Sequence, residues 1–197
     1  MTTLRRFGGR IAVGVALLAL TACSHFLEDD VEKKPEAQAG SLHALTYETL
    51  EGGTHSFAED AGKVLLVVNT ASECGYTPQY EGLEELHRAY APRGFAVVGF
   101  PCDDFGGQEP GDAAAIRQFC TQRFGVTFPL AAKVRVKTGE GQSPVFAFLS
   151  AATGKLPGWN FGKYLVGKDG RAVAFYPSNV APDDPALRSA IETELAR

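Results

Sequence analysis

Cys74 lies in a sequence context that favours a reactive thiol. It follows the apolar stretch 64–68, which predicts a buried β-strand, whereas Pro78 is typical of the first turn of a helix. A cysteine in such a strand-to-helix connection is close to free backbone N–H groups and to the positive end of a helix dipole, which both stabilise a thiolate. Thr77 stands where a Cys-X-X-Cys redox pair has its second cysteine. We therefore predict a nucleophilic thiol, with a buried structural cysteine as the alternative.

Two later segments complete a recognisable pattern. The first is the run 99–111, Gly-Phe-Pro-Cys-Asp-Asp-Phe-Gly-Gly-Gln-Glu-Pro-Gly, and the second is Trp-Asn-Phe at 159–161. Together with the run 69–77, they resemble the signature of the glutathione peroxidase family in its cysteine-containing form. The resemblance extends from about residue 42 to the C-terminus. It implies an α/β, thioredoxin-like fold and thiol peroxidase activity, with a catalytic set made of Cys74, Gln108, Trp159 and Asn160.

Two adjacent positions depart from the family pattern. The family usually has Asn-Gln where this chain has Asp103 and Asp104. Two carboxylates would make the loop more acidic, and we expect this to weaken the binding of an anionic reductant.

These residue types suit the reduction of a peroxide. A thiolate attacks one peroxide oxygen, which gives a sulfenic acid and expels water or an alcohol. Negative charge develops on the leaving oxygen, so hydrogen-bond donors directed at that point lower the barrier. Gln108 and Asn160 offer amide N–H groups, and Trp159 offers its indole N–H. Taken singly, a Trp is typical of a core and a Gln or Asn of a solvated loop, so only the joint pattern supports these roles.

Two further cysteines have different expected roles. Cys102 follows a predicted strand and is interpreted as a small apolar core residue. Cys120 shares the apolar side of a predicted helix with Ile116, which by itself predicts burial. Its position relative to Cys74 also matches the resolving cysteine of the thioredoxin-dependent members of the family. The resemblance therefore implies an intramolecular disulfide between Cys74 and Cys120.

Composition is typical of a single enzyme domain. The chain has 197 residues, of which 45% are hydrophobic and 21% charged, enough for one ordinary core. The net charge of −4 argues against a nucleic-acid partner. The four histidines are scattered along the chain, so we predict no metal site, no histidine base and no cofactor.

The N-terminal segment is typical of a bacterial lipoprotein. Residues 1–22 contain a basic region followed by a short apolar stretch, and they end in Leu-Thr-Ala before Cys23. We interpret 1–22 as a signal peptide, Cys23 as the lipidated N-terminus of a polar tether over 23–41, and 42–197 as the peroxidase domain. Ser24 favours sorting to the outer membrane. The alternative is an unprocessed or conventionally cleaved signal with an incidental cysteine, and Arg5-Arg6 leaves Sec and twin-arginine export open.

Periodicity and turn residues predict a mixed β-sheet flanked by helices. We expect a hairpin within 42–57, helices at 78–90, 113–123, 144–151 and 184–196, and strands at 64–70, 95–100, 164–167 and 172–176. The strand at 95–100 should be parallel to the one at 64–70.

The combined prediction is a periplasm-facing, membrane-anchored thiol peroxidase that reduces hydrogen peroxide and organic or lipid hydroperoxides. Its reductant would be a thioredoxin-like protein, with glutathione as the alternative. The short segment 134–159 lacks the inserted loop of tetrameric relatives and predicts a monomer. A thiol–disulfide oxidoreductase would need a cysteine at Thr77, and a copper carrier would need two close cysteines and a histidine. A non-catalytic envelope lipoprotein predicts the loss of a catalytic residue, and none is lost.

Overall fold

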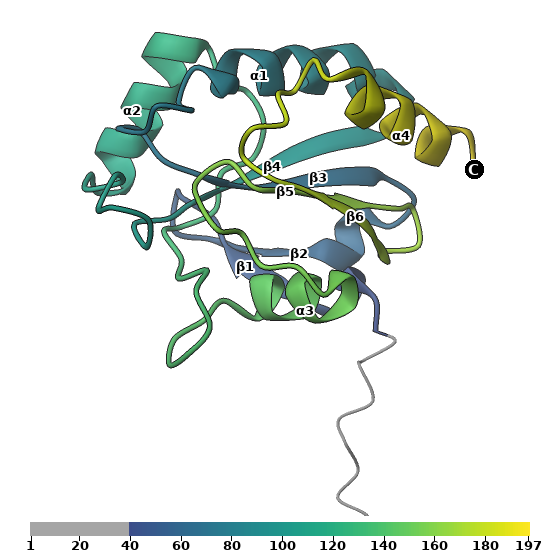
Figure 1. The fold of residues 1–197 in the computed structure, drawn as a ribbon, viewed down its shortest axis with the longest axis horizontal. Helices are drawn as coiled ribbons and strands as arrows, with labels where there is room; N and C mark the ends of the chain where they lie inside the picture. Colours follow the sequence, from purple (N-terminus) through teal and green to yellow (C-terminus); the bar gives the residue numbers. More distant parts are fainter. Residues whose placement is uncertain (1–39) are drawn as a thin grey trace, which may run out of the picture. The chain divides into compact units, whose positions relative to one another are not determined.

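A four-stranded mixed sheet forms the centre of the molecule. The computed structural model describes residues 40–197 (Figure 1). The sheet has the strand order β4-β3-β5-β6, with β3 at Val64–Thr70, β4 at Phe95–Pro101, β5 at Lys163–Val166 and β6 at Ala172–Tyr176. Strands β3 and β4 are parallel, whereas β5 is antiparallel to both β3 and β6. The predicted mixed sheet and the predicted parallel pair are therefore confirmed.

Helices cover both faces of this sheet. Helices α1, α2 and α4 lie over one face, and α3 and the β1–β2 hairpin lie over the other (Figure 1). The helices are α1 at Gln79–Tyr90, α2 at Ala113–Phe124, α3 at Pro144–Thr153 and α4 at Pro185–Ala196; the hairpin pairs β1 at Thr46–Glu48 with β2 at Thr54–Ser56. All four predicted helices and the predicted hairpin are present.

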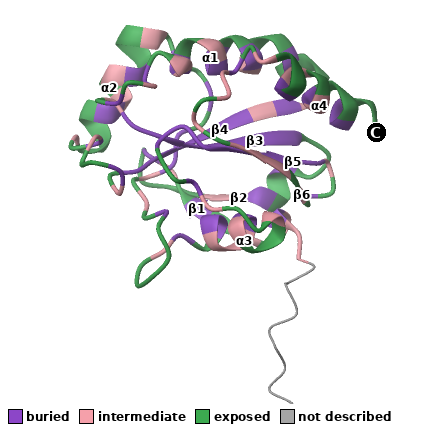
Figure 2. Cartoon of the chain, viewed as in Figure 1, coloured by how far each residue is buried: buried purple, intermediate pink, exposed green. Residues whose placement is uncertain are grey.

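Strand β3 is buried along its whole length because it has a hydrophobic layer on each side (Figure 2). Leu66 and Val68 pack in the layer beneath α1, α2 and α4, and Leu65 and Val67 pack in the layer above α3. Full burial of each such side chain contributes about 1.5–3 kcal/mol. The segment that carries Cys74 therefore starts from a fully buried strand of the sheet.

Capping residues explain the ends of the helices. Asp112 accepts a hydrogen bond from the Ala115 N–H at 2.9 Å, and Asp184 accepts one from the Ala186 N–H at 2.8 Å, so each carboxylate caps the helix that follows it. Helix α3 continues beyond the predicted residue 151 and ends at Thr153. Gly154 caps its C-terminus, with a φ of 66° in the left-handed region. The extended segment expected at 134–136 forms only isolated bridges, for example between Cys102 and Val134.

The predicted signal peptide, the lipidated Cys23 and most of the tether lie outside the described residues. Between residues 40 and 197, no helix is both long enough and apolar enough to cross a membrane.

Candidate active site

Cys74 occupies a tight turn between β3 and α1. Its side chain is 8% exposed, and its Sγ accepts a hydrogen bond from the Tyr76 N–H at 3.4 Å. Thr77 fixes this turn, because its hydroxyl accepts from the Cys74 N–H and donates to the Ala71 carbonyl, both at 2.9 Å. The residue that replaces a second redox cysteine is therefore a structural brace. In the sequence Thr77 is visible only as a missing thiol, because its role depends on contacts with the backbone of residues 71 and 74.

Gln108 is joined to the Cys74 turn through the backbone. The Glu73 N–H donates to the Gln108 carbonyl at 3.0 Å. The neighbouring Glu109 is fully buried, and its carboxylate accepts from the Ser72 hydroxyl at 2.6 Å. Burial raises the pKa of Glu109 above its usual range. These contacts hold the Gln108 loop against the residues that precede Cys74.

The two aspartates of this loop are largely occupied by backbone groups. Asp104 accepts from the Val136 N–H at 2.6 Å and the Lys137 N–H at 2.8 Å, and the Arg135 guanidinium lies 3.6 Å away. Burial alone would raise the pKa of Asp104, but these donors outweigh it and hold the pKa below its usual range. Asp103 is exposed, yet its Oδ1 accepts from the Glu109 N–H at 2.8 Å. The loop therefore presents less free negative charge than its sequence indicates.

Gln108, Trp159 and Asn160 form one cluster. The Asn160 amide donates to Gln108 Oε1 at 3.0 Å, so the NH₂ group is the part of the Gln108 amide that can donate to a substrate. Asn160 is fully buried, whereas Trp159 is 41% exposed and packs against Phe105 with ring centroids 6.1 Å apart. Gly106 lies between Trp159 and Gln108, and a Cβ added there would be 3.5 Å from each. In the described chain, Cys74 Sγ accepts a hydrogen bond from Tyr76 alone, so direct donation by the cluster stays a prediction.

Cys102 and Cys120 are both buried free thiols. Burial raises the pKa of Cys102 to about 12 and that of Cys120 to about 11, so both are neutral while packed. Cys102 lies in the layer above α3, as expected of a core residue. Cys120 lies in α2 and shares the other hydrophobic layer with Cys74. Apart from Cys120, only Ile116 is buried on α2.

Two histidines make side-chain hydrogen bonds that the sequence did not indicate. His87 Nδ1 accepts from the Val97 N–H at 3.3 Å, and His55 contacts a carboxylate. His55 Nε2 lies 2.8 Å from Asp60 Oδ2, and Lys63 also contacts that carboxylate at 2.8 Å. This group is built around the β1–β2 hairpin and contains none of the predicted catalytic residues.

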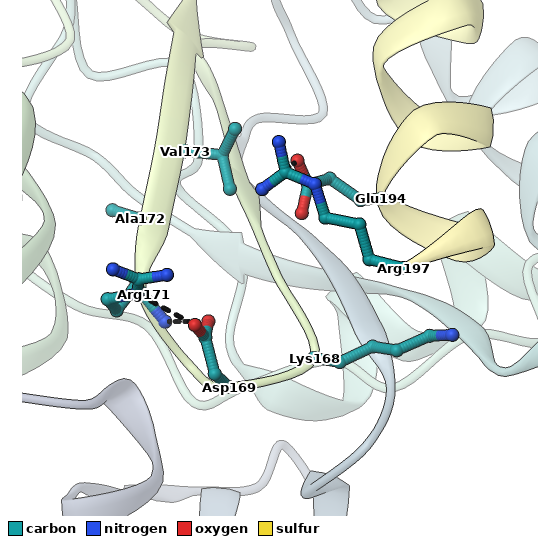
Figure 3. A pocket seen from close by; sticks show the side chains of 7 residues that line it. All are labelled: Lys168, Asp169, Arg171, Ala172, Val173, Glu194 and Arg197. Carbon is teal, nitrogen blue, oxygen red and sulfur yellow. Dashed lines mark hydrogen bonds and ion pairs between the residues drawn. The ribbon is translucent and has the colours of Figure 1, made fainter.

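A separate surface pocket of about 430 Å³ lies between the β5–β6 turn and the C-terminal end of α4 (Figure 3). Its cations are already engaged: Arg171 with Asp169 at 2.7 Å, Arg197 with Glu194 at 3.3 Å, and Lys168 with the Leu195 carbonyl at 2.8 Å. Strand β5 pairs its C-terminal end with the start of β3, so this pocket is at the opposite end of the sheet from Cys74.

Comparisons with known proteins point to one protein family. A family model described as glutathione peroxidase matches residues 42–150. A glutathione peroxidase-like peroxiredoxin, GPX5, of Chlamydomonas reinhardtii is 47% identical over 145 residues, covering 72% of this chain and 89% of the relative. A hydroperoxy fatty acid reductase, gpx1, of Synechocystis is 44% identical over 164 residues, covering 76% and 95%.

Solved structures of similar proteins support the same family and show the same fold. The crystal structure of Trgpx in its apo form is 30% identical, with a TM-score of 0.65, and the match covers 81% of this chain and 98% of that one. Thioredoxin-family structures share the architecture, which confirms the predicted thioredoxin-like fold.

Proposed function

Because the chain belongs to the glutathione peroxidase family and is a thiol peroxidase, we propose that Cys74 is its peroxidatic residue. The observation that carries the proposal is the Cys74 turn itself, which follows a fully buried strand and is tied through Glu73 to the loop of Gln108. A backbone N–H already points at the sulfur. Such a donor favours the thiolate, the form that attacks a peroxide.

The first step oxidises the sulfur of Cys74. The thiolate attacks one oxygen of the peroxide, an S–O bond forms, and the O–O bond breaks. The departing oxygen takes up a proton and leaves as water or an alcohol, and Cys74 becomes a sulfenic acid. Gln108 and Trp159 are the proposed donors to the developing negative charge, and Asn160 orients Gln108 through the 3.0 Å hydrogen bond between their amides.

The proposed donors make a quantitative prediction. Replacing Trp159 with phenylalanine, or Gln108 with alanine, removes one donor and should slow the reaction of Cys74 with peroxide by about 100- to 1,000-fold. Stopped-flow measurement of the second-order rate constant tests this. Trp159 is 41% exposed, so its loss should disturb the core little. Rate constants equal to that of the parent protein would refute the donor roles.

The second step is proposed to involve Cys120. Its thiol attacks the sulfur of the sulfenic acid, a disulfide forms, and the hydroxyl leaves with the thiol proton as water. A thioredoxin-like dithiol then reduces the disulfide by thiol exchange, with glutathione as the alternative donor. A steady-state assay of the purified protein that compares the two reductants decides between them.

We propose hydrogen peroxide and organic or lipid hydroperoxides as substrates. The cyanobacterial relative is named a hydroperoxy fatty acid reductase, and the exposed face of Trp159 offers an apolar surface next to the Gln108 loop. Attachment of the protein to a membrane would bring it close to oxidised lipids. We further propose that it faces the periplasm from the outer membrane and acts as a monomer.

The proposed anchor makes a separate prediction. Protein purified from a Gram-negative host should begin at Cys23 and carry a diacylglyceryl group with a further acyl chain, because two or more chains are needed for stable attachment. Intact-mass and N-terminal peptide mass spectrometry measure this. A matched Cys23→Ala variant should appear in the soluble fraction. An unmodified N-terminus at another residue would refute the lipoprotein assignment.

A further inference from the structure

Asn69 fastens the segment that carries Trp159 and Asn160 to the central strand. Its Nδ2 donates to the Trp159 carbonyl at 3.0 Å, and its Oδ1 accepts from the Gly162 N–H at 3.0 Å. Its backbone adds two more hydrogen bonds: its carbonyl accepts from the Phe161 N–H at 2.6 Å, and its N–H donates to the Gly162 carbonyl at 3.3 Å. The side chain is fully buried, and both ends of its amide are used.

Lys163 provides a second attachment for the same segment. It is fully buried, and its Nζ donates to the Phe161 carbonyl at 2.7 Å. Burial, with no carboxylate contributing, lowers the pKa of Lys163 to about 7. The amine therefore acts here as a hydrogen-bond donor rather than as half of an ion pair, and both its charged and its neutral forms can donate.

The segment held in this way is strained. Phe161 has a φ of 64°, the left-handed conformation that a bulky residue rarely adopts. Gly162 has no room for a side chain, because an added Cβ would lie 3.0 Å from Pro157 and 3.1 Å from Asn69 Oδ1. Strained backbone at such a place persists only when the surrounding contacts determine it. Asn69 and Lys163 supply those contacts.

We infer that Asn69 is a positioning residue for peroxide reduction, with Lys163 in support. Asn69 lies on β3, the strand that leads into the Cys74 turn, and its side chain hydrogen-bonds to the segment that carries Trp159 and Asn160. One side chain thereby sets the distance between the sulfur and the proposed donor cluster. This inference rests on the proposed function, because it needs Trp159 and Gln108 to act on the peroxide.

The test is Asn69→Asp in the purified full chain. The substitution keeps the shape of the side chain and the acceptor for Gly162, but it places a carboxylate oxygen against the Trp159 carbonyl. We expect the second-order rate constant with hydrogen peroxide at pH 7 to fall by about 10- to 100-fold, because small misplacements of reacting groups carry losses of this size. Reduction of the oxidised protein by thioredoxin should be unchanged.

Two readouts distinguish positioning from a loss of stability. At low pH the introduced carboxyl becomes protonated and regains a donor, so the ratio of variant to parent rate constants should rise toward one. The chain has a single tryptophan, so its emission reports the Trp159 segment directly and should shift in the reduced variant. Gln142→Glu is the matched control: its amide donates to the Val136 carbonyl at 3.0 Å, outside the site, and its replacement should leave the rate constant unchanged.

Lys163→Met provides a second variant should Asn69→Asp fail to fold. It removes the donor to the Phe161 carbonyl at similar side-chain length, and it too should slow peroxide reduction without slowing reduction by thioredoxin. Folded variants at both positions with rate constants within twofold of the parent would overturn the inference, provided that Trp159→Phe is slow. If Trp159→Phe is as fast as the parent, the donor roles themselves fail, and the inference fails with them.

Discussion

Replacing Cys74 with serine is expected to abolish peroxide reduction and to leave the fold intact. A hydroxyl has almost the volume of a thiol, and it can still accept the hydrogen bond that Tyr76 donates at 3.4 Å. It has no anionic form near neutral pH, however, so the nucleophile is lost. Peroxide consumption by the purified variant should fall to the uncatalysed background, whereas its circular dichroism and unfolding midpoint should match those of the parent protein.

Cys102→Ala is the matched control for this experiment. Cys102 is fully buried in the layer above α3, and burial raises its pKa to about 12, so it has neither access to peroxide nor a thiolate to react with it. This variant should retain peroxidase activity. Turnover above background in Cys74→Ser would show that another thiol is peroxidatic, and loss of activity in Cys102→Ala would point to that residue.

The fold was predictable because its signals are local. The run 64–70, apolar through residue 68, has the length and β-branched content of a buried strand, and β3 occupies that range. Asp112 and Asp184 precede helical patterns, and both cap a helix. The prediction was weaker where partners decide the outcome. The segment 134–136 has strand-like residues, but without a regular neighbour it forms only single bridges.

The three sequence motifs predict which residues form the candidate site, but they do not predict the hydrogen bonds that hold these residues in position. Asn69 and Gly162 are 93 positions apart in the chain, and Ser72 and Glu109 are 37 apart, so no local pattern predicts either contact. A usable signal did exist. Asn69 is a polar residue in the predicted buried strand, directly after its apolar run, and Lys163 is a cation at the start of another strand; burial of such groups requires partners.

Charge read from the sequence was also an incomplete guide. Asp103 and Asp104 were expected to make the Gln108 loop acidic, but Asp104 is turned inward and receives two backbone N–H groups. Its negative charge is directed at these backbone N–H groups, which holds residues 136–137 in place. The expected penalty for an anionic reductant therefore rests on Asp103 alone, and the choice between glutathione and a thioredoxin-like protein depends more on Cys120.

Helix α2 has few fully buried side chains, although Phe119 and Phe124 also pack against the core. Of its twelve residues, only Ile116 and Cys120 are buried, and Arg117 forms its ion pair with Glu51 at the surface. Exposed ion pairs contribute little to stability. Local opening is easiest where few apolar contacts are broken. We therefore expect the amides of α2 to exchange with deuterium faster than those of β3, and this opening to bring Cys120 to the oxidised Cys74.

Cys120→Ser is expected to stop catalysis after one turnover. The reaction of Cys74 with the first equivalent of peroxide should proceed normally, because Cys120 is not among the proposed donors. The sulfenic acid then has no partner thiol, so recycling by thioredoxin should stall, and further peroxide should convert Cys74 to the sulfinic acid. Peptide mapping of the parent protein after one equivalent of peroxide should recover a Cys74–Cys120 disulfide, and mass spectrometry of the variant should show the added oxygen atoms.

The alternatives give different products in the same experiment. A Cys74–Cys102 disulfide would assign resolution to the other buried thiol, although Cys102 lies in the opposite hydrophobic layer from Cys74. Normal recycling of Cys120→Ser by thioredoxin would leave Cys120 as a core residue only. Recycling of that variant by glutathione alone would identify a mixed disulfide on Cys74 as the intermediate, because glutathione can attack the sulfenic acid directly. The parent protein would then use Cys120 only when a dithiol is the reductant.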